Sequence, residues 1–248
     1  MNDGEETSTT RFGFCGQNGR YTAPPVFRWL DLKRDDRMPD IGCGSVLWTL
    51  AMAPRVHSIV GLDLRLRSVH EAKKHSEQQG YGNTAFVVAS ATALPFSNNS
   101  FDKVLSIDVL DNIPEDQRAA CEMVRVLNRG GKLVATAMLK DRLWYLRPIC
   151  YPEHIRNYSR RELSSLVEAA GLKLIGTFEF YRAFSTLARE LADMAHRSRL
   201  SRIPGVGLFT AILLSALARL DFLSHQTGGG FGVIATKELG PDGHGIES

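Results

Sequence analysis

The sequence predicts an α/β fold in which helices cover both faces of a doubly wound, mostly parallel sheet. First, short apolar runs of strand length alternate with helical patterns between residues 37 and 138. Second, glycines stand where two of these helices should end, at Gly80 and Gly130. Third, hydrophobic residues make up 44% of the 248 residues, which supplies a full core without metal or disulfide support. Alternating strands and helices are typical of parallel sheets.

Strand-like runs and helical patterns follow each other along the chain. The helix at residues 160–170 should begin after Ser159 as its N-cap and end at Gly171. The predicted helices of the core are residues 67–79, 115–127 and 160–170, and the predicted strands are residues 38–41, 58–62, 85–89, 103–107, 132–137, 172–181 and 230–237.

A long insertion divides the second half of the chain. The 48 residues from 182 to 229 separate the last two strands and contain a basic patch followed by an apolar helix. A connection of this length inside a compact domain is usually functional. We therefore expect an N-terminal tail and capping segment at residues 1–36, a core at 37–181, a helical lid at 182–229, and the last strand with a C-terminal tail at 230–248. Phe27 and Trp29 of the capping segment should either line the pocket or join the core.

Charge, cysteine usage and hydropathy exclude several classes of protein. A net charge of +3 is too small to indicate a nucleic-acid-binding tract. The four cysteines are far apart and form no CxxC pair, so we expect no metal site and no disulfide scaffold, and a reducing, cytoplasmic compartment. The most apolar stretch, residues 205–218, is shorter than the roughly 20 residues that span a bilayer. Peripheral membrane contact through residues 197–223 stays open, because basic residues there precede the apolar helix.

A glycine turn followed by a carboxylate indicates a nucleotide-like ligand. Asp40-Ile41-Gly42-Cys43-Gly44-Ser45 follows the first predicted strand, and its two glycines let the backbone approach a ligand without obstruction by a Cβ atom. Asp63 ends the next strand, where a carboxylate can accept both hydroxyls of a ribose. The ligand should therefore carry adenosine and lie outside the carboxyl ends of the strands.

The rest of this ligand should be cationic. The dinucleotide fingerprint G-x-G-x-x-G requires a third glycine, and Leu47 stands in its place. Asp40 before the first glycine would repel a pyrophosphate, whereas it suits the sulfonium and ammonium groups of S-adenosylmethionine. A nicotinamide-dependent oxidoreductase is the alternative that the missing glycine disfavours.

Four segments in order resemble the class I S-adenosylmethionine-dependent methyltransferases. Over roughly residues 37–138 the resemblance indicates the branch that contains quinone and other small-molecule methyltransferases. It implies a Rossmann-like methyltransferase fold with seven strands, the last of them antiparallel, and a helical insertion before that strand. The segments are Asp40–Ser45 (D-x-G-x-G), residues 91–96 with 100–102 (A-x-x-LPF…SFD), residues 109–114 (VL-x-x-IP) and residues 125–131 (RVL-x-PGG).

The resemblance also implies S-adenosylmethionine as the cofactor and assigns residues to its parts. Gly42 and Gly44 would line the methionine part, Asp63 would hold the ribose, and Leu64 would pack on the adenine. Ser90 and Ala91 would meet the adenine edge, and Ile107 would lie beside the methionine ammonium. The expected cofactor-binding residues are Asp40, Gly42, Cys43, Gly44, Asp63, Leu64, Ser90, Ala91 and Ile107.

Methyl transfer from a sulfonium requires alignment and exclusion of water, and a base only where the acceptor loses a proton in the transition state. His154, in the loop after the fifth strand, is the general-base candidate because histidine titrates near neutrality. Asp108 and Asp111, just past the fourth strand, could orient His154 or the acceptor. A hydrogen-bonded structural histidine and solvated or helix-capping carboxylates are the alternatives. The substrate-binding candidates are Tyr151, Arg156, Tyr158 and Tyr181.

The insertion should cover the acceptor pocket, because it leaves the sheet at the cofactor edge. Its apolar helix favours a small hydrophobic acceptor, such as a lipid, a quinone or a polyketide-like molecule, methylated on oxygen or carbon by in-line displacement. The same helix could instead pack inside the domain or form the seam of a homodimer.

Two other hypotheses compete with the small-molecule enzyme. Val46 replaces a small residue of the glycine motif and Ser90 replaces an acid, and both favour a catalytically silent methyltransferase-fold partner or scaffold. A nucleic-acid methyltransferase is disfavoured, because the sequence has neither an N/D-P-P-Y/F run nor a basic tract interleaved with aromatic residues.

Overall fold

The computed structural model describes residues 17–44, 46–140, 155–180 and 229–239, with side chains from residue 22 onward. Its strands are β1 (Arg37–Ile41), β2 (Ser58–Asp63), β3 (Thr84–Val88), β4 (Phe101–Ile107), β5 (Leu127–Met138), β6 (Lys173–Phe180) and β7 (Gly230–Thr236). Its helices are α2 (Gln17–Leu30), α3 (Leu47–Met52), α4 (Leu66–Gln79), α5 (Asp116–Val126) and α7 (Arg160–Ala169), with 3-10 turns at Ala53–Arg55 and Leu110–Asn112.

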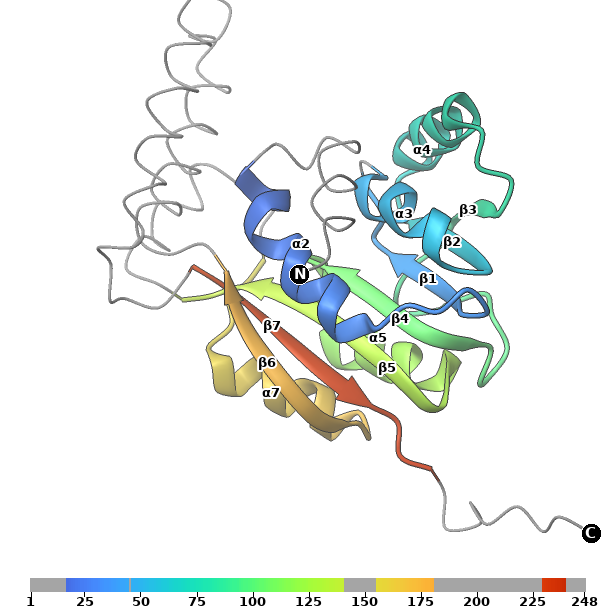
Figure 1. The fold of residues 1–248 in the computed structure, drawn as a ribbon. Coiled ribbons are helices and arrows are strands. Elements are labelled where there is room, and N and C mark those ends of the chain that lie inside the picture. The colour runs from blue at the N-terminus through green and yellow to red at the C-terminus, as the bar shows by residue number, and fades with distance from the viewer. Residues whose placement is uncertain (1–16, 45, 141–154, 181–228, 240–248) are drawn as a thin grey trace, which may run out of the picture.

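The seven strands form one sheet in the order β3-β2-β1-β4-β5-β7-β6 (Figure 1). The strands from β3 to β5 pair in parallel, and β7 is antiparallel to both β5 and β6. This arrangement confirms the predicted doubly wound sheet with an antiparallel last strand. From β1 the chain adds β2 and then β3 on one side of the sheet, and it then crosses back to place β4 on the other side of β1. The order reverses there, and ligands of open α/β sheets bind at such a switch point.

Helices cover both faces of the sheet. The helices α5 and α7 bury one face, with Met123 and Val167 among the fully buried side chains, while α2, α3 and α4 lie on the other (Figure 1). The strands β1, β2, β4 and β5 each contribute apolar side chains to the cores on both faces, which explains why they read as apolar runs in the sequence.

Local signals in the sequence predicted three helix ends correctly and one wrongly. Gly171, where the helix at 160–170 was expected to end, directly follows the C-cap of α7 with a φ of 101°. The Ser159 hydroxyl accepts a hydrogen bond from the Glu162 amide at 3.2 Å, while the Glu162 carboxylate accepts one from the Ser159 amide at 2.6 Å, so α7 begins with a capping box. Gly80 ends α4 in a left-handed conformation, with φ of 73°. Gly130 is not a helix cap: α5 ends at Val126, and Gly130 lies within the range of β5 and donates its amide hydrogen to the Lys237 carbonyl at 2.7 Å.

The aromatic residues of α2 belong to the core. Phe27 packs against Trp48, with ring centroids 6.2 Å apart, and the Arg55 guanidinium lies over the Phe27 ring at 4.4 Å. Trp29 covers the backbone of Gly176 in β6. These contacts anchor α2 against the face of the sheet that α3 also covers.

Residues 182–228 of the proposed lid and residues 1–16 of the N-terminal segment lie outside the described residues. The same is true of the basic patch and apolar helix at 197–223. Within the described part of the chain, no helix is both long and apolar enough to cross a membrane.

Lys237, just after β7, closes the end of α5. Its ammonium donates hydrogen bonds to the carbonyls of Val124 and Leu127, at 2.8 and 2.7 Å, and to the Asn99 side chain at 2.7 Å. A cation at a helix C-terminus satisfies unpaired carbonyls and complements the helix dipole. Burial, together with the nearby Arg129, lowers the pKa of Lys237.

We predict that Lys237→Met lowers the free energy of unfolding by about 2 kcal/mol, because hydrogen bonds from a charged group are lost and two carbonyls lose their donor. Urea denaturation followed by circular dichroism measures this change. Lys173→Met is the matched control, since the Lys173–Glu238 pair is exposed and should contribute less than about 1 kcal/mol. Equal stability of the two variants would contradict the capping role.

Candidate functional site

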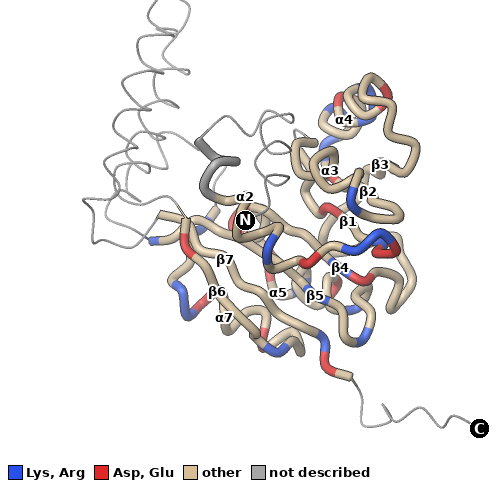
Figure 2. Tube along the Cα trace, viewed as in Figure 1, with Lys and Arg blue, Asp and Glu red and all other residues tan. Residues whose placement is uncertain are grey.

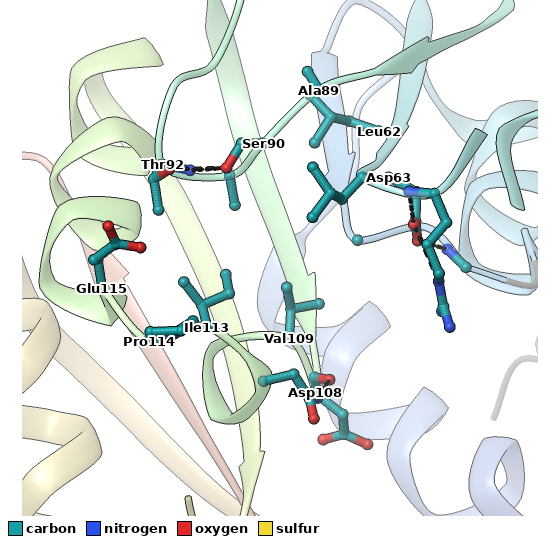
Figure 3. Close-up of a pocket in the computed structure, with 16 residues that line it drawn as sticks. Leu62, Asp63, Ala89, Ser90, Thr92, Asp108, Val109, Ile113, Pro114 and Glu115 are labelled. Atoms are coloured by element: carbon teal, nitrogen blue, oxygen red, sulfur yellow. Dashed lines mark hydrogen bonds and ion pairs between the residues drawn. The ribbon is translucent and has the colours of Figure 1, made fainter. Parts of the chain in front are cut away.

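A cavity of about 510 Å³ opens where the carboxyl ends of the parallel strands meet (Figure 3). Residues that directly follow or end β1, β2, β3 and β4 line it, which places it at the switch point of the sheet. The lining residues are Gly42, Gly44, Leu62, Asp63, Leu64, Arg65, Ala89, Ser90, Ala91, Thr92, Asp108, Val109, Asn112, Ile113, Pro114 and Glu115.

The glycine turn after β1 forms one wall of this cavity. The amides of Gly42 and Cys43 both donate to the Leu62 carbonyl, at 2.7 and 2.9 Å, which ties the turn to the end of β2. Gly42 has a φ of 74°, and a Cβ atom there would collide with the side chain of Val109. Glycine is therefore required at this position both by the backbone conformation and by the approach of Val109.

Asp63 connects the turn to the start of α4. One of its carboxylate oxygens accepts from the Gly44 amide at 3.1 Å, and the other accepts from the Arg65 amide at 2.9 Å. The Arg65 guanidinium is 3.6 Å from the second oxygen. A carboxylate can accept about four hydrogen bonds, so Asp63 holds the turn and still has acceptor capacity toward the cavity.

The loop after β3 forms the opposite wall. The hydroxyls of Ser90 and Thr92 lie 2.8 Å apart, and the Thr92 amide donates to Ser90 Oγ at 3.2 Å. Figure 3 shows both side chains at the end of the cavity away from Asp108.

A clamp from α5 fixes the segment that follows Thr92. Arg125 donates to the carbonyls of Leu94 and Phe96, at 2.9 and 2.7 Å, and Glu122 accepts from the Leu94 amide at 2.7 Å. Glu122 and Arg125 also pair with each other, and this hydrogen bond lowers the pKa of Glu122. The helix α5 thus holds the backbone of this segment in place.

The acids that follow β4 have different surroundings. Asp108 lines the cavity. Asp111 is 1% exposed, and its carboxylate accepts from the Met138 amide at 3.3 Å and from the Asn112 side chain at 3.0 Å. The Asp111 carbonyl also accepts from the amides of Ile155 and Arg156. Asp111 therefore joins three chain segments beneath the cavity and does not line it.

Arg156 and Tyr158 brace the cavity wall from behind. The Tyr158 hydroxyl donates to the Asp116 carboxylate at 2.6 Å, and its ring is buried. Arg156 pairs with the same carboxylate and donates to the Pro114 carbonyl at 2.6 Å. Burial, with Asp116 close by, raises the pKa of Tyr158, so its hydroxyl stays protonated. Neither residue lines the described cavity.

Three of the expected cofactor-binding residues lie outside the lining. Asp40 is 2% exposed and accepts from the Thr49 hydroxyl at 2.6 Å; burial raises its pKa to about 6. Cys43 is buried, and burial together with Asp40 and Asp63 raises its pKa, which keeps the thiol protonated. Ile107 is partly buried and packs against the core beneath α2.

The remaining expected site residues divide into two groups. Gly42, Gly44, Leu64, Ser90 and Ala91 line the cavity together with Asp63 and Asp108. His154, Tyr151 and Tyr181 lie outside the described residues. The lining also includes Arg65, Thr92, Val109 and Glu115, for which the sequence predicted no role in the site. Of these, Val109 lies in the segment 109–114 that carries part of the resemblance.

The described lining is negatively charged and holds no recognisable metal site. It contains the carboxylates of Asp63, Asp108 and Glu115 and one guanidinium, that of Arg65. Among the described residues, no group of histidine, cysteine, aspartate and glutamate side chains could hold a metal ion. Such a lining favours a cationic ligand over a pyrophosphate.

Comparison with known proteins agrees with this geometry. Residues 39–135 match the family model described as a methyltransferase domain. These residues form a class I S-adenosylmethionine-dependent methyltransferase domain. The glycine turn, Asp63, the loop after β3 and Asp108 all lie within this methyltransferase domain.

The matches to curated relatives cover only part of each relative's length. A demethylmenaquinone methyltransferase of Geobacillus kaustophilus is 30% identical over 129 residues, which are 51% of this chain and 55% of that protein. The uncharacterized methyltransferase YcgJ of Bacillus subtilis is 25% identical over 151 residues, 58% of this chain and 60% of that protein. The chain thus matches little more than half the length of these curated relatives.

Solved structures share the fold of the methyltransferase domain. The [4+2]-cyclase SpnF has a TM-score of 0.67 and 24% identity, over 87% of this chain and 79% of that one. A phosphoethanolamine N-methyltransferase of Haemonchus contortus, in complex with S-adenosyl-L-methionine, has a TM-score of 0.63 and 18% identity, over 86% of this chain and 51% of that one. At these identities the likeness shows the fold alone.

We predict that Gly42→Ala destabilises the protein by more than about 1 kcal/mol, because the new methyl group displaces Val109 and the backbone conformation becomes strained. Thermal and urea denaturation measure the loss. Gly82→Ala serves as the control, since a Cβ atom there meets nothing within 4 Å. A Gly42→Ala variant as stable as Gly82→Ala would show that the turn does not need glycine.

Proposed function

We propose that the chain transfers the methyl group of S-adenosylmethionine to a small, hydrophobic acceptor, on oxygen or carbon. The observation that carries this proposal is the negatively charged cavity at the switch point, where the Asp63 carboxylate ends β2 and a glycine turn follows β1. A pyrophosphate would meet Asp63, Asp108 and Glu115, whereas a sulfonium gains from them.

The residues present fit an adenosyl ligand. Asp63 can accept hydrogen bonds from ribose hydroxyls, which is the role of the acidic residue in nucleotide sites on doubly wound sheets. Ser90 and Thr92 supply hydroxyls at the far end of the cavity, and Leu64, which is 72% exposed, supplies an apolar surface at its rim. Val46, which could have crowded the ligand, is buried against Leu50 and Ala72 and does not line the cavity.

The cofactor supplies the methyl group as an electrophile bound to a cationic sulfur. The protein aligns the acceptor with that group, and Asp63 and the glycine turn hold the adenosyl end in place. We assign His154 as the general base for a protic acceptor. Asp108, which lines the cavity, would orient His154 or the acceptor. Asp111, Arg156 and Tyr158 support the cavity wall through the contacts described above.

The acceptor is proposed as a hydrophobic molecule of the quinol class. The relative that is 30% identical is named for action on demethylmenaquinone. Residues 182–229 would cover this acceptor together with Tyr151 and Tyr181, and residues 197–223 would contact a membrane surface or a second copy of the chain. Acidic and basic residues are interspersed along the described elements (Figure 2), so no basic stripe there suggests nucleic acid.

The first test is calorimetric titration of S-adenosylmethionine into the protein and into Asp63→Ala. We expect binding by the wild type and a loss of about 1.5–3 kcal/mol, or about 10- to 150-fold in affinity, in the variant, as for hydrogen bonds to a charged group. Asp63→Asn keeps one acceptor oxygen and should lose less. Absence of binding by the folded wild type would favour a catalytically silent partner protein.

The second test concerns pH. Burial raises the pKa of Asp40 to about 6, and a bound cation favours its carboxylate form. Binding should therefore release a proton near this pH, and affinity for S-adenosylmethionine should rise from about pH 5 to about pH 7 and then level off. Titrations in buffers of different ionisation enthalpy measure the released proton. Asp40→Asn should flatten the dependence, and an unchanged profile in this variant would exclude Asp40 as its source.

A further inference from the structure

The backbone of Asp108 takes a conformation that is uncommon for a residue with a side chain. Its φ is 54°, in the left-handed region, directly after β4 ends at Ile107. Aspartate tolerates this region better than most residues, and such conformations persist where surrounding contacts enforce them. At this point the chain turns from the sheet toward the cavity wall at residues 109–115.

The contacts that enforce this conformation come from Thr136 in β5. The Asp108 amide donates to the Thr136 carbonyl at 3.2 Å and to Thr136 Oγ1 at 3.1 Å. The Thr136 hydroxyl in turn donates to Asp108 Oδ1 at 2.8 Å. A hydroxyl has a single hydrogen, so this geometry fixes both the direction of the hydroxyl and the position of the carboxylate.

Thr136 itself is placed by the sheet. It is 0% exposed and stands in register with Ile107 of β4 and Gly232 of β7. It does not line the cavity, whereas Asp108 does. Any effect of Thr136 on a ligand must therefore act through Asp108.

The position of Asp108 suits the cationic end of the proposed ligand. Ser90 and Thr92 lie at one end of the cavity and Asp108 at the other, with Asp63 along the side (Figure 3). If the adenosine lies between Asp63 and Ser90, its sulfur substituent extends toward Gly42 and Asp108. A carboxylate close to a sulfonium stabilises it by Coulomb attraction, and a neutral thioether gains nothing comparable.

We propose that Thr136 is a positioning residue that holds the Asp108 carboxylate as the counter-charge to the sulfonium. The inference rests on the proposed function and adds a source of discrimination between the charged methyl donor and its neutral product. Asp108 provides the charge, and Thr136 provides its orientation.

The test compares two ligands that differ in this charge. S-adenosylmethionine and S-adenosylhomocysteine are titrated calorimetrically into the wild type, Asp108→Asn, Thr136→Val and Thr136→Ser. Asparagine keeps the acceptor oxygen for Thr136 and removes the charge, valine keeps the branched shape and removes the hydroxyl, and serine keeps the hydroxyl. Thr177→Val, on the exposed side of β6, is the control for a threonine-to-valine change in a strand.

We expect Asp108→Asn and Thr136→Val to weaken S-adenosylmethionine about 5- to 20-fold more than S-adenosylhomocysteine, as the loss of a nearby charge requires. Thr136→Ser and Thr177→Val should keep the wild-type ratio of the two affinities. Circular dichroism establishes folding, and Thr136→Ala replaces the valine variant if valine does not fold.

Two results would overturn the inference alone: an equal loss for both ligands in Thr136→Val, which a merely structural role predicts, or an altered ratio in Thr136→Ser as large as in Thr136→Val. A wild-type protein that is folded but binds neither ligand would overturn the proposed function and the inference together. The two failures are therefore distinguishable.

Discussion

The close approach of Val109 to the bare backbone of Gly42 constrains the two loops on which the cavity depends. One loop follows β1 and the other follows β4, and the chain moves away from this point in opposite directions across the sheet. Without a Cβ atom on Gly42 the loops meet closely, and the cavity is bounded by backbone on one side and by Val109 on the other. Asp63 holds the turn through the Gly44 amide, and the clamp from α5 separately fixes the segment after Thr92.

The three aspartates after β4 show how similar sequence signals lead to different roles. Asp108, Asp111 and Asp116 lie within nine positions of one another, yet only Asp108 lines the described cavity. Asp111 joins the ends of β4 and β5, and Asp116 accepts hydrogen bonds from Tyr158 and Arg156. The charge available to a ligand is thus separated from the charges that maintain the wall.

The parts of the fold that depend on local patterns could be predicted from the sequence. Apolar runs placed the strands closely, except that β5 begins at Leu127 and not at residue 132. Ser159 and Gly80 marked helix ends because caps depend on neighbouring backbone. Gly130 was misjudged because its conformation depends on a hydrogen bond to Lys237, which is remote in sequence. Arg156 and Tyr158 were assigned to the substrate for a similar reason: their partner Asp116 lies some 40 positions earlier, and no local pattern reveals this pairing.

The place of β7 has a consequence for how the chain folds during synthesis. This strand lies between β5 and β6, although residues 181–229 separate it from β6 along the chain. While a ribosome is still translating that stretch, β6 has no neighbour in the sheet and Lys237 does not yet close α5. Formation of the non-local pairing is intrinsically slow, so the nascent chain carries an incomplete sheet edge until β7 emerges and inserts.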